Sequence, residues 1–226
     1  QSNTQPVDHR NTLMQTILNT PDDPAHDSLV EKKSEFIGDA AHVDTLDEAL
    51  AFVAAIREQH PKARHVAYAA VCGGAEGRQS ECMSDDGEPS GTAGKPILDV
   101  LKQSGTTDCV VAVTRYFGGI LLGSGGLVRA YSSAASLAMK AARAARIMTA
   151  KRYRVRLEYP QLARFQQILA QLGGSQEDES YAANVELTAV VPQDDCVRFE
   201  ERVRETFNAA VVPAPIDMVN IPVPLA

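Results

Sequence analysis

The sequence predicts an α+β protein made of two domains, and three observations lead to this class. A capping box at residues 45–48 opens a helical repeat of apolar residues, and short apolar runs typical of strands stand on both sides of it. A glycine-rich loop at 118–126 leads into a long alanine-rich segment. From residue 152 the expected elements follow the order βαββαβ, which is the ferredoxin-like arrangement.

The first domain is expected to contain a well-capped helix among several strands. Thr45 stands as the N-cap with Glu48 three residues later, and apolar residues keep helical spacing until His60-Pro61 stops the helix. The last of the strands is apolar throughout and is therefore predicted to be buried on both faces. These strands are expected at 34–43, at 65–72, around Cys82 and at 109–113.

Two more helices complete the first domain. Pro96 suits the first helical position, and an apolar stripe runs from there to Gly105, where the helix is expected to end. The second helix is expected from about Leu127 to Ile147. Its many alanines would let it lie close against a sheet.

The second domain is expected to alternate strands and helices in the order given above. A helical stripe between 162 and 172 closes at Gly173, and a second helix places Cys196, Val203 and Phe207 inward. The strands are expected at 152–159, 175–181, 184–191 and 210–219, followed by a proline-broken tail. The predicted parts of the chain are therefore a flexible tail at 1–27, a first domain at 28–148 and a second domain at 149–226.

Composition narrows the class of function. With 22 Lys and Arg against 29 Asp and Glu, the 226-residue chain has a formal charge of −7, which argues against whole-surface attraction to nucleic acid. No apolar run approaches the roughly 20 residues that span a bilayer, and no secretory signal leads the chain. The four cysteines form no CxxC pair, the spacing that zinc sites favour. These features indicate a reduced, cytoplasmic protein without a membrane, metal or cofactor site, and they leave the oligomeric state open.

The stretch SDDGEPSGTAGKP combines three carboxylates with turn-forming residues. In an enzyme, Asp85, Asp86 and Glu88 would be oxygen ligands for magnesium or an acid–base pair. Adjacent aspartates in an extended segment point to opposite faces, however, which makes a shared ion difficult. The alternative is a tightly specified turn, in which Glu88 and Thr92 satisfy loop amides or cap the helix that follows. The turn interpretation is favoured, and no catalytic residue is predicted here.

The stretch RYFGGILLGSGGLVRAY, residues 115–131, places glycines just before a helix, where free amides and the helix dipole suit an anion. It is not a Walker loop, because Ser124 stands where the lysine belongs. It is not a dinucleotide fingerprint either, because Val128 stands where the third glycine belongs. Close packing of the loop against neighbouring backbone is the favoured interpretation.

Basic residues gather in a window that lacks acidic ones. Between Val110 and Leu157 there is no Asp or Glu, yet nine of the chain's 22 basic residues fall there. Arg152, Arg154 and Arg156 alternate with apolar residues, so they share one face of a strand, which we expect to be the face that helices leave open. Solvated arginines on a polar face are the alternative, but the guanidinium fork suits phosphate. The predicted phosphate contacts are Arg115, Arg129, Arg152, Arg154 and Arg156.

Together, the two stretches closely resemble the signature of the IMPACT family, with further echoes in KKSEFI at 32–37 and ARH at 63–65. The resemblance covers about residues 28–226. It implies a first domain similar to ribosomal protein S five domain 2 and elongation factor G domain IV, and a ferredoxin-like second domain similar to elongation factor G domain V. The signature positions in the two loops are Asp85, Asp86, Gly87, Glu88, Pro89, Gly91, Thr92, Gly94, Lys95, Tyr116, Gly118, Gly119, Gly123, Gly125, Gly126 and Tyr131.

The resemblance also implies a bacterial-type member, because the chain has no room for the N-terminal RWD domain of eukaryotic members. For such members the family implies a link to RNA or the ribosome, without an established reaction. Our leading hypothesis is a cytoplasmic RNA- or ribosome-associated regulatory protein linked to translation. The second is an enzyme that binds a nucleotide or phosphate ligand at the glycine-rich loop, with Lys95 facing a phosphate. Residues 123–134 are loosely similar to the loop of sugar and mevalonate-type kinases. The third is a protein-interaction module that binds an acidic partner through the same arginines.

Overall fold

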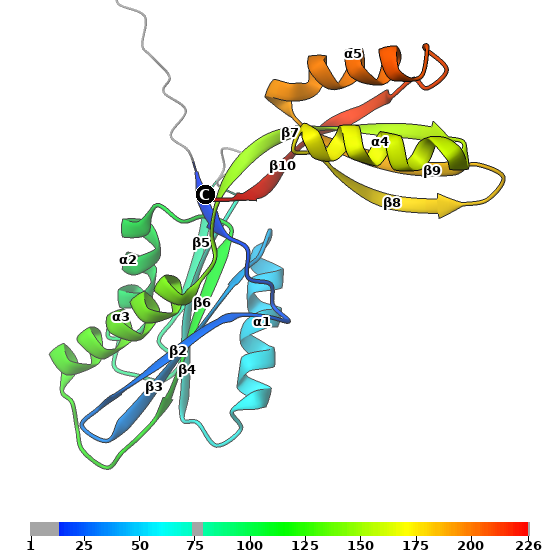
Figure 1. The fold of residues 1–226 in the computed structure, drawn as a ribbon. Helices are drawn as coiled ribbons and strands as arrows, with labels where there is room; N and C mark the ends of the chain where they lie inside the picture. The colour runs from blue at the N-terminus through cyan, green and yellow to red at the C-terminus, as the bar shows by residue number, and fades with distance from the viewer. Residues whose placement is uncertain (1–13, 74–78, 226) are drawn as a thin grey trace, which may run out of the picture. The chain divides into compact units, whose positions relative to one another are not determined.

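The structure is a computed structural model that describes residues 14–73 and 79–225. Over these residues the chain is a mixed α+β protein with two five-stranded sheets and five α-helices (Figure 1). It divides into two compact units, which are residues 1–147 with 222–226 (unit 1) and residues 148–221 (unit 2). Each unit is described by itself below.

Unit 1 is built on an antiparallel sheet that has helices on both faces. The strand order is β2-β3-β6-β4-β5. One face carries α1, and the other carries α2 and α3 (Figure 1). The bounds are β2 Ala25–Glu31, β3 Ser34–His42, α1 Leu46–Gln59, β4 His65–Cys72, β5 Ser80–Ser84, α2 Gly94–Ser104, β6 Cys109–Tyr116 and α3 Ser124–Ala141.

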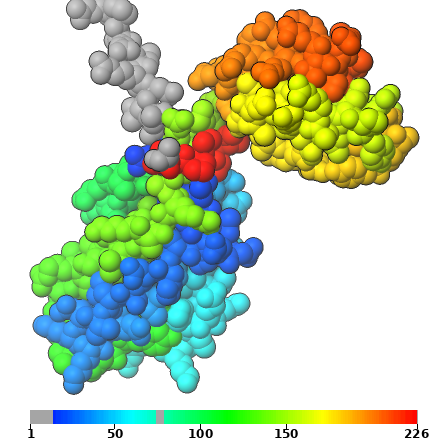
Figure 2. Space-filling model, viewed as in Figure 1, coloured from blue at the N-terminus to red at the C-terminus, as the bar shows by residue number. Residues whose placement is uncertain are grey.

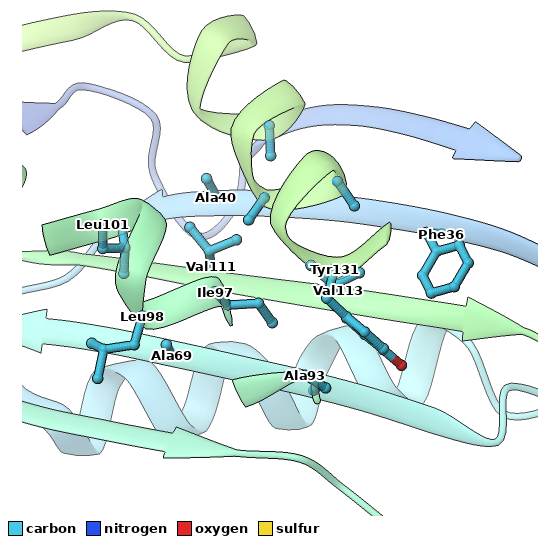
Figure 3. Close-up of a cluster of buried hydrophobic side chains, with 14 of the residues drawn as sticks. Phe36, Ala40, Ala69, Ala93, Ile97, Leu98, Leu101, Val111, Val113 and Tyr131 are labelled. Carbon is cyan, nitrogen blue, oxygen red and sulfur yellow. The ribbon is translucent and has the colours of Figure 1, made fainter. Parts of the chain in front are cut away.

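The central strand β6 is buried on both faces, as its continuous apolar run predicts. Val111 points into the cluster under α2 and α3, where it meets Ile97 and Tyr131 (Figure 3). Val110 points the other way, into the cluster under α1. Side chains alternate across a strand, so an apolar residue at every position is stable only where both faces are covered. The structure therefore confirms this strand.

The local helix signals are confirmed with small shifts. Thr45 caps α1 by accepting a hydrogen bond from the Glu48 amide at 3.2 Å, and His60 follows the last helical residue. Pro96 is the third residue of α2 rather than the first, and the amides of Ala93 and Gly94 at the start of the helix donate to Asp85. Gly105 ends α2 with a φ of +67°, a left-handed conformation that glycine adopts without steric cost.

The predicted helix from Leu127 to Ile147 is wrong at both ends. The helix begins at Ser124 and ends at Ala141, and residues from Ala144 onward form a strand instead. Alanine favours a helix locally, but here the backbone pairs with a segment more than a hundred residues away. The strand β1, Gln15–Ile17, pairs with residues 144–146.

The predicted flexible tail at 1–27 is also corrected where the structure describes it. Residues 14–27 hold β1 and the start of β2, and Ile17 is only 2% exposed. The side chain of Asn19 accepts a hydrogen bond from the Arg143 amide at 2.8 Å, which fixes the junction after α3. Burial of its apolar patch therefore holds this segment against unit 1. Residues 1–13 lie outside the described part.

Unit 2 follows the predicted order of elements. Its sheet has the strand order β10-β7-β9-β8. Tyr153, Phe165 and Phe199 are fully buried between the sheet and the two helices. Phe207 follows α5 as its C-cap and is partly buried, whereas Phe199 is the inward residue that the helical spacing missed. The bounds are β7 Ala144–Leu157, α4 Tyr159–Gln171, β8 Ser175–Tyr181, β9 Val185–Pro192, α5 Cys196–Thr206 and β10 Ala214–Pro224.

The proline-broken tail predicted after residue 219 is instead the end of β10. This strand continues to Pro224, and every second residue near its end is exposed. Proline is tolerated in a strand where its missing N–H faces solvent, which is the situation of an edge strand. In unit 2, β7, β9 and β8 pair antiparallel, β10 pairs with β7, and α4 and α5 cover the face that carries Tyr153.

Candidate functional site

The two signature stretches meet in unit 1 through one buried carboxylate. Glu88 accepts hydrogen bonds from Arg115 Nη1 at 2.6 Å and from Tyr131 Oη at 2.7 Å. The side chains of Glu88 and Arg115 are 4% and 7% exposed. Burial, together with the hydrogen bond to Glu88, raises the pKa of Tyr131 far above its ordinary value, so its hydroxyl remains a neutral donor. These bonds join the 84–96 loop to β6 and α3.

The buried position of Arg115 conflicts with its predicted role as a phosphate contact. Its guanidinium lies over the rings of Phe36 and Phe117, at 5.4 and 5.5 Å from the ring centroids, and its charge is balanced by Glu88. A guanidinium held in this way is a scaffold group with no free face for a ligand. The sequence could not reveal this, because Glu88 lies 27 positions away, outside the acid-free window.

Asp85 fastens the loop to the start of α2. Its two carboxylate oxygens accept hydrogen bonds from the amides of Gly91 at 2.8 Å, Ala93 at 3.0 Å and Gly94 at 2.8 Å. Partial burial raises the pKa of Asp85, but the three amide bonds outweigh it and lower the pKa overall. The helix cap expected from Glu88 or Thr92 is therefore made by Asp85. Thr92 instead donates from its hydroxyl to the Pro89 carbonyl at 2.6 Å.

Asp86 has different partners from the other two carboxylates. It accepts hydrogen bonds from the Val66 amide at 2.7 Å and from Arg57 at 2.9 Å. The three acidic groups thus have separate partners, and among the described residues no three His, Cys, Asp or Glu side chains gather as a metal site. Lys95 is paired with Asp99 on the surface of α2. The carboxylates of this loop are therefore engaged in bonds that fix its shape.

Two histidines contact the signature stretches, His65 from β4 and His60 from the end of α1. Asp86 O lies 2.7 Å from His65 Nδ1, and Gly87, with a φ of +84°, packs against the His65 ring. Tyr116 Oη lies 2.9 Å from Nδ1 of His60 at the end of α1. Gly91 also has a positive φ, of +76°. The polar residues of this stretch therefore specify its shape.

The glycine-rich loop packs closely, as predicted. A Cβ on Gly118 would lie 1.9 Å from the Lys33 carbonyl oxygen, and one on Gly126 would lie 2.9 Å from Leu122 Cβ. Gly119 and Gly123 have φ values of +84° and +75°, which favour glycine on conformational grounds. A Cβ on Gly125 would make only an ordinary contact, 3.5 Å from Arg129 Nη1.

Exposed apolar and basic residues gather at one end of unit 1. We call this surface the loop end, and it comprises residues 31–33, 62–64 and 117–123 with Arg129. The Arg64 guanidinium lies 5.9 Å from the centroid of the Phe117 ring. Lys32, Leu122 and Arg129 line a shared groove of about 400 Å³, where β2 and α3 lie side by side (Figure 2).

The loop end differs from ordinary surface in two respects. Phe117 is 42% exposed and Leu121 is 81% exposed, although both are large apolar residues. The flanking cations have no ion pair with a carboxylate of the described residues. These cations are Lys32, Lys33, Lys62, Arg64 and Arg129, and Glu31 is the carboxylate of the same surface.

The other predicted arginines lie on the open face of the unit 2 sheet. Arg154 and Arg156 are exposed and Arg152 is half-buried, whereas Tyr153, Val155 and Leu157 point under α4 and α5. Their placement agrees with the alternation in the sequence. Two of these three arginines form ion pairs with carboxylates of unit 2. Arg152 makes two hydrogen bonds to Asp217, at 2.7 and 2.6 Å, and Arg156 lies 3.9 Å from Glu186.

The acid-free window in the sequence is therefore not acid-free in space. Arg143 pairs with Asp23 at 3.0 Å, and Lys151 lies 3.5 Å from Glu200. Arg154 is the member of the open face that has no carboxylate partner within the described residues. Sequence reasoning did not identify Lys32, Lys33, Arg64 or Phe117 as site residues. Two short segments that resemble the family, KKSEFI and ARH, nevertheless contain Lys32, Lys33 and Arg64.

Comparisons with known proteins agree with the two-unit organisation. Residues 32–139 match the Impact N-terminal domain, and residues 155–210 match a domain of unknown function, DUF1949. IMPACT family member YigZ of Escherichia coli (strain K12) is 40% identical, over 77% of this chain and 85% of that protein. IMPACT family member YvyE of Bacillus subtilis (strain 168) is 36% identical, over 81% of this chain and 83% of its own.

A solved structure agrees as well. The crystal structure of a hypothetical protein, 35% identical, superposes with a TM-score of 0.60 and covers 90% of this chain and 97% of that one. Among the described residues no helix is both long enough and apolar enough to cross a membrane. The matches run through both signature stretches, and on these grounds the chain belongs to the IMPACT family.

Proposed function

We propose that this protein is a non-enzymatic binding protein linked to translation, which contacts RNA or the ribosome through the loop end. The observation that supports it best is the loop end itself, where Arg64 lies over exposed Phe117 and the cations have no ion pair with a carboxylate of the described residues. Lys and Arg side chains bind phosphates, and an exposed aromatic ring can stack on an unpaired base. A surface of this kind suits a structured RNA with accessible bases.

The charge of the whole chain makes a local contact more plausible than a diffuse one. At a formal charge of −7, the protein repels nucleic acid except where cations are concentrated. Five phosphate contacts at the loop end would give a slope of log K against log salt of about −3.5, at roughly 0.7 per contact for single strands.

The open face of unit 2, centred on Arg154, is the second candidate contact. The surface pairs of Arg152 and Arg156 can exchange a carboxylate for a phosphate, because exposed ion pairs contribute only about 0–1 kcal/mol. Glu186 of β9 stands across from Arg156, and Glu177 lies one strand further, on β8, across from Thr188, which pairs with Arg154. Their negative charge makes this face less suited to RNA than the loop end.

The proposal also includes the fold of each unit and the location of the protein. We assign unit 1 the fold of ribosomal protein S five domain 2, also that of elongation factor G domain IV. Unit 2 is assigned the ferredoxin-like fold of elongation factor G domain V, because β10-β7-β9-β8 is the strand order that this fold requires. A cytoplasmic location accords with four free cysteines.

The test is a fluorescence-anisotropy titration of a labelled structured RNA at several salt concentrations. The loop-end variant is Arg64→Glu with Arg129→Glu, and the open-face variant changes Arg152, Arg154 and Arg156 to Glu. The control, Lys95→Glu with Lys140→Glu, makes the same change in net charge as the loop-end variant at exposed sites elsewhere in unit 1.

We expect the loop-end variant to lose at least about tenfold in affinity and to flatten the salt dependence. The control should lose much less. Equal losses in the loop-end and control variants, or no binding by the wild type at low salt, would refute the loop end as an RNA contact. Binding lost only in the open-face variant would move the contact to unit 2. A partner captured through the loop end that survives nuclease treatment would favour the protein-interaction alternative.

A further inference from the structure

Unit 1 contains a second surface hollow that the proposed function does not use. It is a groove of about 520 Å³ beside α1, a volume within the range of ordinary ligand sites. Ala51 and Ala55, one helical turn apart, are exposed and leave space along the helix, and Phe52 forms part of the wall. Ile17 and Pro222 line the other side with apolar surface. The groove would therefore hold an apolar side chain.

The charged residues that line the groove are all acidic. They are Asp22, Asp44 and Glu48; the histidine of the lining, His42, lies against Asp44, and no Lys or Arg of the described residues lines the groove. Asp22 has no hydrogen bond or ion pair within the described residues. Glu48 uses Oε2 for the Asp44 amide at 2.8 Å, and Asp44 Oδ1 lies 3.1 Å from His42 Nε2, so each retains a second oxygen. Free carboxylate oxygens around an apolar hollow favour a ligand that combines a cation with an apolar group.

We propose that this groove binds a segment of a partner protein in which an apolar side chain stands next to a Lys or Arg. The apolar side chain enters between Ala51 and Ala55, and the cation pairs with Asp22 or Glu48. RNA is excluded as an occupant, because its phosphates would face three carboxylates. Unit 1 thus presents two surfaces of opposite chemistry, a basic loop end and an acidic, apolar groove.

A labelled peptide of alternating Lys and Leu is the probe, titrated by fluorescence anisotropy against the full-length protein. Asp22→Lys reverses a carboxylate without a structural role, and Ala55→Trp fills the hollow from an exposed helical position. The matched control, Glu58→Lys, makes the same charge reversal on α1 outside the groove. Circular dichroism melting verifies that each variant is folded.

We expect each groove variant to lower the affinity for the peptide by about tenfold, equivalent to about 1.4 kcal/mol, while Glu58→Lys changes the affinity much less. A peptide with Ser in place of Leu, at the same charge, should bind more weakly than the parent. Absence of binding by the wild type, equal losses in Glu58→Lys, or equal affinity for the Ser peptide would each overturn the proposal. Wild-type dimerisation that Ala55→Trp abolishes would overturn it too, since the occupant would then be a second copy of this chain.

Discussion

At the residue scale, Glu88 holds the two signature stretches in one arrangement. It is the carboxylate that balances the buried Arg115, and it also receives the Tyr131 hydroxyl. The Nε atom of Arg115 has no hydrogen-bond partner within the described residues, so the guanidinium depends on Glu88 for its neutralisation. Removing one member of a buried pair costs more than the pair itself contributes, because the other charge stays behind without a partner.

We therefore expect Glu88→Ala to lower the free energy of unfolding by about 3–5 kcal/mol, measured by urea denaturation with circular dichroism. Adding Arg115→Met should recover part of this loss, because the orphaned charge is then removed. Glu81→Ala is the control, since the Glu81–Lys102 pair at 2.9 Å is partly exposed and should cost only about 0–1 kcal/mol. Equal small losses in the two single variants would mean that the buried pair does not stabilise the fold.

At the element scale, the features encoded by neighbouring residues were predictable. The cap at Thr45, the stop at Gly105 and the buried run of β6 depend on short stretches of chain. The β1 strand and the early end of α3 depend on pairing between Ile17 and Ala144, which no local pattern encodes. Long-range pairing decides between helix and strand wherever local propensity alone is weak or misleading.

The candidate site follows the same division. Its carboxylates, glycines and arginines were recognisable as unusual from the sequence, and the preference for a structural loop over a metal site agrees with the bonds of Asp85 and Asp86. The sequence could not show that Arg115 is buried against Glu88, nor that Arg64 lies over Phe117. Both contacts join elements that are distant in the chain.

The loop end provides a prediction about how elements position each other. Gly118 lies against the backbone of the β2–β3 turn, and a Cβ there would also come within 2.0 Å of the Lys33 carbonyl carbon. Gly118→Ala should therefore displace the loop, destabilise the protein by about 1–3 kcal/mol and weaken RNA binding. The matched change Gly125→Ala, whose Cβ meets nothing closer than 3.5 Å, should be close to neutral. Calorimetric melting and the anisotropy titration would measure both effects, and indistinguishable behaviour of the two variants would contradict the packing role of Gly118.

At the scale of the whole molecule, the chain has separate cores. Two hydrophobic clusters fill the faces of the unit 1 sheet, and a third, which contains Phe165, fills unit 2. None of the described residues belongs to clusters of both units. Burial of apolar surface is the main source of stability, so each unit is stabilised by its own core.

Phe165→Ala tests whether the units are energetically separate, and it also tests where RNA binds. The side chain is fully buried, so its truncation should cost unit 2 about 3–5 kcal/mol. Hydrogen exchange measured by peptide should then speed up in β9 and α5, while β3 and β6 keep their protection.

Because the loop end belongs to unit 1, RNA affinity should persist in the Phe165→Ala variant. The Phe52→Ala variant, which weakens the unit 1 core, should instead lose RNA affinity on mild heating. Loss of protection in both units after Phe165→Ala would mean that they unfold as one. Loss of RNA affinity without loss of unit 1 protection would instead place the binding surface on the open face around Arg154.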